Sequence, residues 1–475
     1  MRVLLQSPAP DHPGGDTSHL IEKTREYLAA VGVAADHTCE LEPDLAGYDL
    51  VHLFGAPKMD DLLTQCANAQ RQCKPLVFSA QYWDEGRLPE CLGAEQPLPT
   101  AVRLAHSFGD HLYRVVLGEA DVVLTASQME GGWLTRDMGV APEQQRVVPL
   151  AAESFFAAAD AEPFVERVGV RDFVLCSAVL ARPKNQLRLI RALRGFNTPL
   201  VLAYPSAEDG YERRCREEAG DDVIFVGRLD PDELASAYAA AKVHALVSCY
   251  EPTGMSSIEA GLAGCNLVCT AHSPISEYVG NRAWYADPLD VAAIRRAVEL
   301  AHRVPKSHIL RNELLANFTW ERTARLTLAA YEGLLAVGHA AAHRKGEARY
   351  RWLTACRRSV GELRDRVMAV TAAADAASAA SAPARAQARI DTLTRSLRER
   401  DEQLQAITDT WAYRLHHYLA TSAPARALRH VHDPGPPPVF HAPRGPALDA
   451  LGHRAEDIQR VLVVAEASAW HVLRA

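Results

Sequence analysis

Two glutamates eight residues apart are the strongest candidates for chemistry in this sequence. Glu251 follows an apolar, strand-like run, and Glu259 lies inside the amphipathic segment that comes next. Thr253, Gly254 and Met255 between them are typical of a tight turn into a helix, where free N–H groups and the helix dipole favour a phosphate. Glu251 could then bind sugar hydroxyls, and Glu259 could bind ribose hydroxyls.

A structural role for Glu259 is the alternative. Ser256 and Glu259 have the S-x-x-E spacing of a capping box, so this glutamate could serve only to cap its helix. Glutamate pairs are also common in a chain with 59 acidic residues.

Two cations form a second candidate element. Arg182 and Lys184 lie in the ARPKNQ loop between a predicted strand and a predicted helix. Cations at a helix N-terminus are electrostatically unfavourable unless an anion lies there too, and a nucleotide diphosphate would supply it. The alternative is that both side chains point to solvent.

The passage around Glu251 and Glu259 resembles the retaining glycosyltransferases of family 4, whose signature is E-x7-E. The similarity extends backward through DDVIFVGRLD, which adds Gly227 and Arg228 as donor-binding candidates, and forward through GCNLVCTAHSPISEYVG. The resemblance implies a GT-B fold, in which two Rossmann-like domains face a cleft. It also implies a nucleotide-sugar donor in the second domain and a last helix, 320–335, that returns to the first.

The same resemblance implies a front-face reaction that retains the anomeric configuration. Lys184, Arg182 and the N–H groups around Gly254 would stabilise the leaving diphosphate, while Glu251 would orient the sugar. Lys184 matches the family's lysine. The family's arginine position holds Val179 here, with Arg182 three residues later.

The acceptor side of the cleft has weaker candidates. Gly14 and Gly15 follow the first predicted strand, and the family has a similar loop that lines its cleft from the acceptor domain, which makes them donor-binding candidates; an ordinary turn is the alternative. Gln81, Tyr82 and Trp83 follow another predicted strand, and the two aromatic rings could stack on a sugar or simply pack in the core.

No metal or cofactor is expected. Asp230 and Asp232 have D-x-D spacing, but Pro231 between them indicates a helix start. No His/Cys cluster has zinc spacing, and the phosphate loops of NTPases and dehydrogenases have no match.

Short apolar runs alternate with amphipathic stretches through residues 1–335, which predicts two parallel α/β sheets. These would form an acceptor domain, 1–150, and a donor domain, 151–335. The predicted strands are 2–6, 49–54, 75–79, 121–125, 146–148, 173–180, 200–204, 223–226, 244–247 and 267–269. The predicted helices are 19–31, 102–117, 186–193, 232–241 and 257–263.

The remaining chain is predicted to be a helical extension. Residues 336–382 are basic and then Ala-rich, 383–420 carry a heptad pattern, and 421–475 hold a Pro-rich linker and a terminal helix. The stretch 344–366 has a net charge of about +5, which favours a membrane surface or an anionic acceptor, or else a solvated helix face. The heptads predict a coiled coil and a homo-oligomer; the alternative is one amphipathic helix lying on the enzyme.

Composition narrows the functional classes. A net charge of −8 argues against nucleic-acid binding. The sequence has no apolar run long enough for a membrane span, and its ten cysteines form no CxxC pair, so a cytoplasmic protein, peripheral to the membrane at most, is expected. The function predicted is transfer of a sugar to a glycan, lipid-linked or protein acceptor in bacterial polysaccharide synthesis. A non-catalytic scaffold on a degenerate transferase body is the alternative; a phosphorylase or epimerase lacks its motifs.

Overall fold

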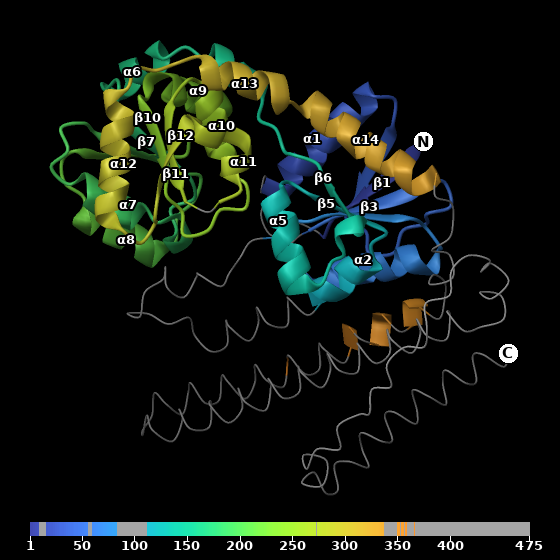
Figure 1. Ribbon diagram of the computed structural model, residues 1–475. Helices are drawn as coiled ribbons and strands as arrows, with labels where there is room; N and C mark the ends of the chain where they lie inside the picture. The colour runs from blue at the N-terminus through green and yellow to red at the C-terminus, as the bar shows by residue number, and fades with distance from the viewer. Residues whose placement is uncertain are drawn as a thin grey trace, which may run out of the picture. The chain divides into compact units, whose positions relative to one another are not determined.

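The computed structural model describes residues 1–8, 16–55, 59–82, 112–271 and 273–336, together with short pieces between 349 and 365 (Figure 1). All of these residues belong to one compact unit, Met1–Arg366. The predicted coiled coil, 383–420, and the Pro-rich segment after it lie outside the described residues. No helix in the described part of the chain is long and apolar enough to span a bilayer.

The first domain is built on a sheet of six parallel strands in the order β2-β1-β3-β4-β5-β6. The strands are β1 (Arg2–Gln6), β2 (Ala34–Thr38), β3 (Leu50–Phe54), β4 (Leu76–Ser79), β5 (Val122–Thr125) and β6 (Gln145–Val147). Helices α1 (Asp16–Ala30), α2 (Met59–Arg71) and α5 (Gln128–Trp133) belong to the same domain. Every residue of β3 is buried, as expected for a central strand covered on both faces.

The second domain repeats this plan with strand order β12-β11-β10-β7-β8-β9. Its strands are β7 (Val174–Ser177), β8 (Leu200–Ala203), β9 (Val223–Gly227), β10 (Val243–Leu246), β11 (Asn266–Thr270) and β12 (Ala283–Ala286). Its helices are α6 (Glu162–Val168), α7 (Gln186–Leu193), α8 (Asp209–Glu218), α9 (Pro231–Ala240), α10 (Met255–Leu262), α11 (Ile275–Val279), α12 (Val291–Arg303) and α13 (Ile309–Asn317).

The strand order reverses between β7 and β10, which lie side by side at the centre of the second sheet. From β7 the chain moves outward to β8 and β9, and from β10 it moves the other way to β11 and β12. In open parallel sheets, ligands bind outside the carboxyl ends of the strands at such a reversal. The loops after β7 and β10 are therefore the place where a donor site is expected.

The last long helix returns to the first domain, as predicted. Figure 1 shows α14 (Trp320–Ala336) alongside α1. Trp320 and Tyr331 of α14 are buried in the core of the first domain. Tyr331 Oη lies 2.6 Å from Nδ1 of the buried His52 on β3.

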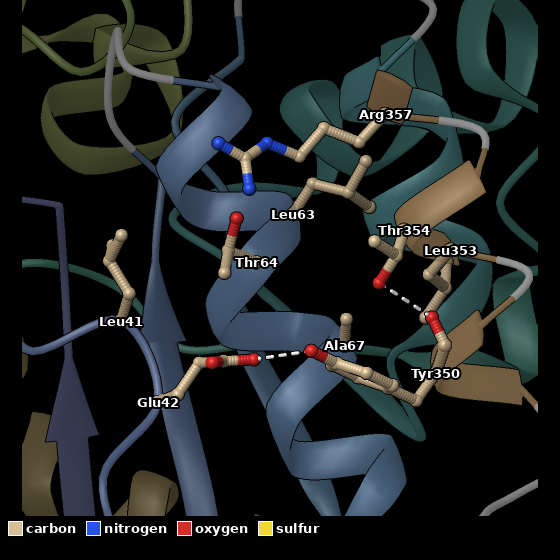
Figure 2. Close-up of a pocket in the computed structure, with 9 residues that line it drawn as sticks. All are labelled: Leu41, Glu42, Leu63, Thr64, Ala67, Tyr350, Leu353, Thr354 and Arg357. Carbon is tan, nitrogen blue, oxygen red and sulfur yellow. Dashed lines mark hydrogen bonds between the residues drawn. The ribbon is translucent and has the colours of Figure 1, made fainter. Parts of the chain in front are cut away.

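A short helical piece from the basic stretch packs on the first domain. Leu353 is fully buried, Arg349 forms an ion pair with the buried carboxylate of Glu119, and Tyr350 donates a 2.8 Å hydrogen bond to Glu42. Figure 2 shows this piece facing α2. Together they line a cavity of about 220 Å³. Its basic residues are thus not all solvated: Arg349 anchors the segment, whereas Arg358 is exposed.

Candidate donor-binding site

Lys184 and Glu251 meet where the strand order reverses. Lys184 ends the 3₁₀ turn Arg182–Lys184 after β7, and Glu251 follows β10. The Lys184 ammonium donates to Glu251 Oε2 at 2.8 Å, and Ser248 Oγ donates to the same oxygen at 2.9 Å. The glutamate side chain is 9% exposed and the lysine 26%. The structure thus brings together the two residues that the sequence suggested for sugar and diphosphate.

Asn185 holds this turn in place and was not among the residues predicted from the sequence. Its backbone is left-handed, with φ 65°, which Asn tolerates better than most residues. Its buried amide donates to Val247 O at 2.9 Å and Pro288 O at 2.8 Å. Cys249 N also donates to Pro183 O at 2.7 Å, so the loops after β7 and β10 are joined through backbone groups. An Asn directly before a helix is the only local signal.

Gly254 turns the chain into α10. Its φ is 83°, and it is the N-cap of the helix, where a glycine supplies no side-chain cap. A methyl group at Gly254 would lie 3.4 Å from Ile275 Cβ and 3.5 Å from Glu251 Cγ. The first-turn N–H groups have the arrangement that a phosphate requires. Thr253 is buried beside this turn, and Met255 is partly buried.

Glu259 does not form the capping box that its spacing allowed. Because the helix begins at Met255, Ser256 lies inside it and is not the N-cap. Glu259 instead accepts a 3.0 Å hydrogen bond from the hydroxyl of Tyr238 on α9. Its partial exposure is compatible with a ribose-binding role, which stays a prediction.

Arg182 has a different partner from Lys184. Its Nε donates to Glu208 Oε1 at 2.7 Å, and its Nη2 pairs with the same oxygen. A diphosphate would therefore have to bind Arg182 alongside Glu208, or displace Glu208 from it. Gly227 ends the edge strand β9, two strands beyond β7, and Arg228 follows it; Gly227 has φ 69° and Arg228 is exposed.

The acceptor-side candidates Gln81 and Tyr82 follow β4, and Gly14, Gly15 and Trp83 lie outside the described residues. Tyr82 stacks on Tyr113, with ring centroids 6.2 Å apart, and its hydroxyl donates to Asp137 at 3.2 Å. The ring of Tyr82 therefore packs within the domain in this structure.

Glu130 on α5 organises this acceptor-side loop. Its buried carboxylate accepts Tyr82 N at 2.8 Å and Ala126 N at 2.6 Å. Burial raises the pKa of Glu130 to about 8, although these two N–H donors favour the ionised form. Glu130 was not among the residues predicted from the sequence. The S-x-x-E spacing of Ser127 and Glu130 was the available signal, and Ser127 does cap α5.

Asp230 begins α9 as predicted. Its side chain accepts from Glu233 N, and the side chain of Glu233 accepts from Asp230 N, which forms a complete capping box behind Pro231. Across the described residues, no group of three His, Cys, Asp or Glu side chains could hold a metal ion. Cys176, Cys249 and Cys269 are buried free thiols.

Comparisons with known proteins agree with this architecture. Residues 161–314 match the family model described as Glycosyl transferases group 1. The serotype-specific mannosyltransferase WbdA of Escherichia coli is 30% identical over 181 residues, which cover 34% of this chain and 22% of WbdA. The chain therefore spans about a fifth of that relative's length.

Two solved structures share the fold. Sucrose-phosphate synthase from Thermosynechococcus elongatus superposes with a TM-score of 0.59 at 20% identity, over 71% of this chain and 100% of that one. Anabaena HepE, solved in complex with UDP, gives a TM-score of 0.55 at 17% identity, over 70% of this chain and 100% of HepE. The second domain thus carries the group 1 glycosyltransferase sequence pattern, and the two domains together have the GT-B fold.

Proposed function

We propose that this protein is a retaining glycosyltransferase of family 4 that uses a nucleotide-sugar donor. The observation that carries the proposal is the Lys184–Glu251 pair, which lies at the strand-order reversal near the N-terminus of α10, whose N-cap is Gly254. A cation and the first-turn N–H groups of a helix suit a diphosphate, and a nearly buried carboxylate suits sugar hydroxyls. The match of residues 161–314 to group 1 glycosyltransferases supports the same assignment.

The chemistry follows from the charges that the reaction develops. The bond between the anomeric carbon and the diphosphate oxygen breaks while the acceptor oxygen bonds to that carbon from the same face. The acceptor's proton passes to the leaving phosphate oxygen. Lys184 and the first-turn N–H groups of α10 stabilise the negative charge on the diphosphate. Both described donors to the Glu251 carboxylate bind Oε2, and we propose that Oε1 accepts from a sugar hydroxyl.

The identity of the substrates is a further part of the proposal. Because WbdA is named a mannosyltransferase, we propose a mannosyl donor and a glycan or lipid-linked acceptor of a bacterial polysaccharide. Fixed cations and backbone dipoles would replace a metal ion. The basic segment on the first domain would hold the enzyme near an anionic membrane or acceptor, and the extension would join copies of the chain.

A panel of sugar nucleotides tests the proposal. GDP-mannose or UDP-glucose at about 100 times its dissociation constant should stabilise the protein by about 2.7 kcal/mol. The same compound should be consumed with release of the nucleoside diphosphate when an acceptor is present. A full panel with neither a thermal shift nor nucleotide release would overturn the proposal and favour the scaffold alternative.

A further inference from the structure

The segment from Ser273 to Tyr278 touches both domains within six residues. On the donor side, Ser273 Oγ donates to Glu251 O at 3.4 Å, and Ile275 packs against the Gly254 turn. On the acceptor side, Glu277 reaches the first turn of α5, and Tyr278 reaches the loops that follow β5 and β6. The donor turn and the acceptor domain are therefore held by one short piece of chain.

Tyr278 makes the more buried of the two contacts. Its hydroxyl donates to Ala126 O at 2.7 Å and accepts from Leu150 N at 3.1 Å, while the residue is 5% exposed. Burial raises the pKa of this phenol, so the hydroxyl stays protonated and keeps donating to Ala126 O. Its ring lies 4.6 Å from the ring of Phe318, measured between centroids, which fixes the side chain without the hydroxyl.

Glu277 adds a second, exposed contact. Its two carboxylate oxygens accept Gln128 N at 2.8 Å and Met129 N at 2.7 Å. These are the first-turn N–H groups of α5, so a carboxylate from one domain caps a helix of the other. Solvent screens this contact, so we expect it to contribute less than the Tyr278 hydroxyl to holding the two domains together.

On the acceptor side, the residue that Tyr278 contacts is connected to the Tyr82 loop through hydrogen bonds to Glu130. Ala126, whose carbonyl accepts from Tyr278, has its own N–H bound by Glu130 Oε2. The other oxygen of Glu130 binds Tyr82 N. One peptide segment and one buried carboxylate therefore separate Tyr278 from the acceptor-side loop.

We infer that Tyr278 is a positioning residue, which sets the acceptor-side loop at Tyr82 relative to the donor turn at Glu251 and Gly254. The inference rests on the proposed function. A transferase must bring the acceptor oxygen to the anomeric carbon in a narrow range of geometry, and small displacements lower the rate steeply. Water is smaller and mobile, so hydrolysis of the donor is less sensitive to the same displacement.

Tyr278→Phe tests the inference, because it removes the hydroxyl and keeps the ring. Tyr285→Phe is the matched control: that hydroxyl donates to Gly280 O at 2.6 Å inside the second domain. Transfer from GDP-mannose to methyl α-mannoside and hydrolysis of GDP-mannose without an acceptor would be measured for both variants. GDP binding would be measured by calorimetry, and amide exchange at Leu150 by mass spectrometry.

In Tyr278→Phe we expect the kcat of transfer to fall about 5- to 150-fold, the range for a buried group left unpaired. Hydrolysis and GDP affinity should stay within about twofold, since the nucleotide site lies in the second domain. The Leu150 amide should exchange faster, whereas Tyr285→Phe should match the wild type in every assay.

Two results would overturn the inference. One is an unchanged ratio of transfer to hydrolysis in Tyr278→Phe. The other is a parallel loss of GDP binding, which would make Tyr278 a general structural residue. If the wild type neither binds nor consumes any sugar nucleotide, the proposed function fails as well. The Leu150 exchange rates would then still show whether the contact between the domains exists.

Discussion

The Lys184–Glu251 pair predicts how substitution of Glu251 changes the transfer rate, the stability and the affinity for a nucleoside diphosphate. Glu251→Gln removes the negative charge that neutralises Lys184 while keeping an amide of almost the same shape. The variant loses a charge-assisted hydrogen bond, which contributes about 1.5–3 kcal/mol. If Glu251 orients the donor sugar, transfer should therefore fall about 10- to 150-fold. The lysine is 26% exposed and can turn to water, so the loss of stability should stay near 1–2 kcal/mol, below the value for a fully buried pair.

The same variant should bind a bare nucleoside diphosphate more tightly than the wild type. The released Lys184 ammonium no longer divides its charge between Glu251 and the phosphates, whereas Lys184→Gln should bind GDP or UDP more weakly. Calorimetric titration of both variants measures the two opposite shifts. Glu299→Gln is the control, because it removes a carboxylate paired with Arg295 on the surface of α12. Equal GDP and UDP affinities in wild type and Glu251→Gln would refute the placement of the diphosphate beside Lys184.

Three further predictions concern metal, acid and assembly. Because Asp230 caps α9, transfer should survive EDTA; a complete loss restored by a divalent ion would contradict this. Burial lowers the pKa of His52 and His244 to about 3, so the stability they contribute is present above pH 6.5 and is lost as the pH falls toward 3, by up to about 1.4 kcal/mol per unit for each. Urea unfolding at pH 7 and pH 5 should show a smaller loss in His52→Gln than in wild type, and identical losses would count against it. The particle mass from light scattering should correspond to more chains for the full protein than for a chain ending at Ala382; monomers in both cases would exclude an oligomer formed by the heptads.

Most of the fold could be predicted because buried strands and amphipathic helices leave strong local patterns. β1 and α7 have the predicted bounds, and the central strands deviate by a few residues at their ends. β2 and β12 were missed, and both are edge strands. β2 has the sequence AADHT and carries no buried residue, so the apolar run that marks a central strand is absent.

Some residues of the candidate site could also be predicted from their neighbours in the sequence, whereas others depend on contacts with distant residues. Lys184, Glu251 and Gly254 could be predicted because a helix terminus, a charge and a turn lie within a few residues of each other. The parallel sheet then brings the loops after β7 and β10 together without further information.

Asn185, Glu130 and Tyr278 act through backbone amides and carbonyls of other loops. Tyr278 binds Ala126, which is 152 positions away. A backbone carbonyl is present at every residue, so its partner leaves no mark on the amino-acid type at the accepting position. The sequence can therefore propose which side chains meet the substrate, but the residues that hold the two domains in register become visible only when both chain segments are placed in space.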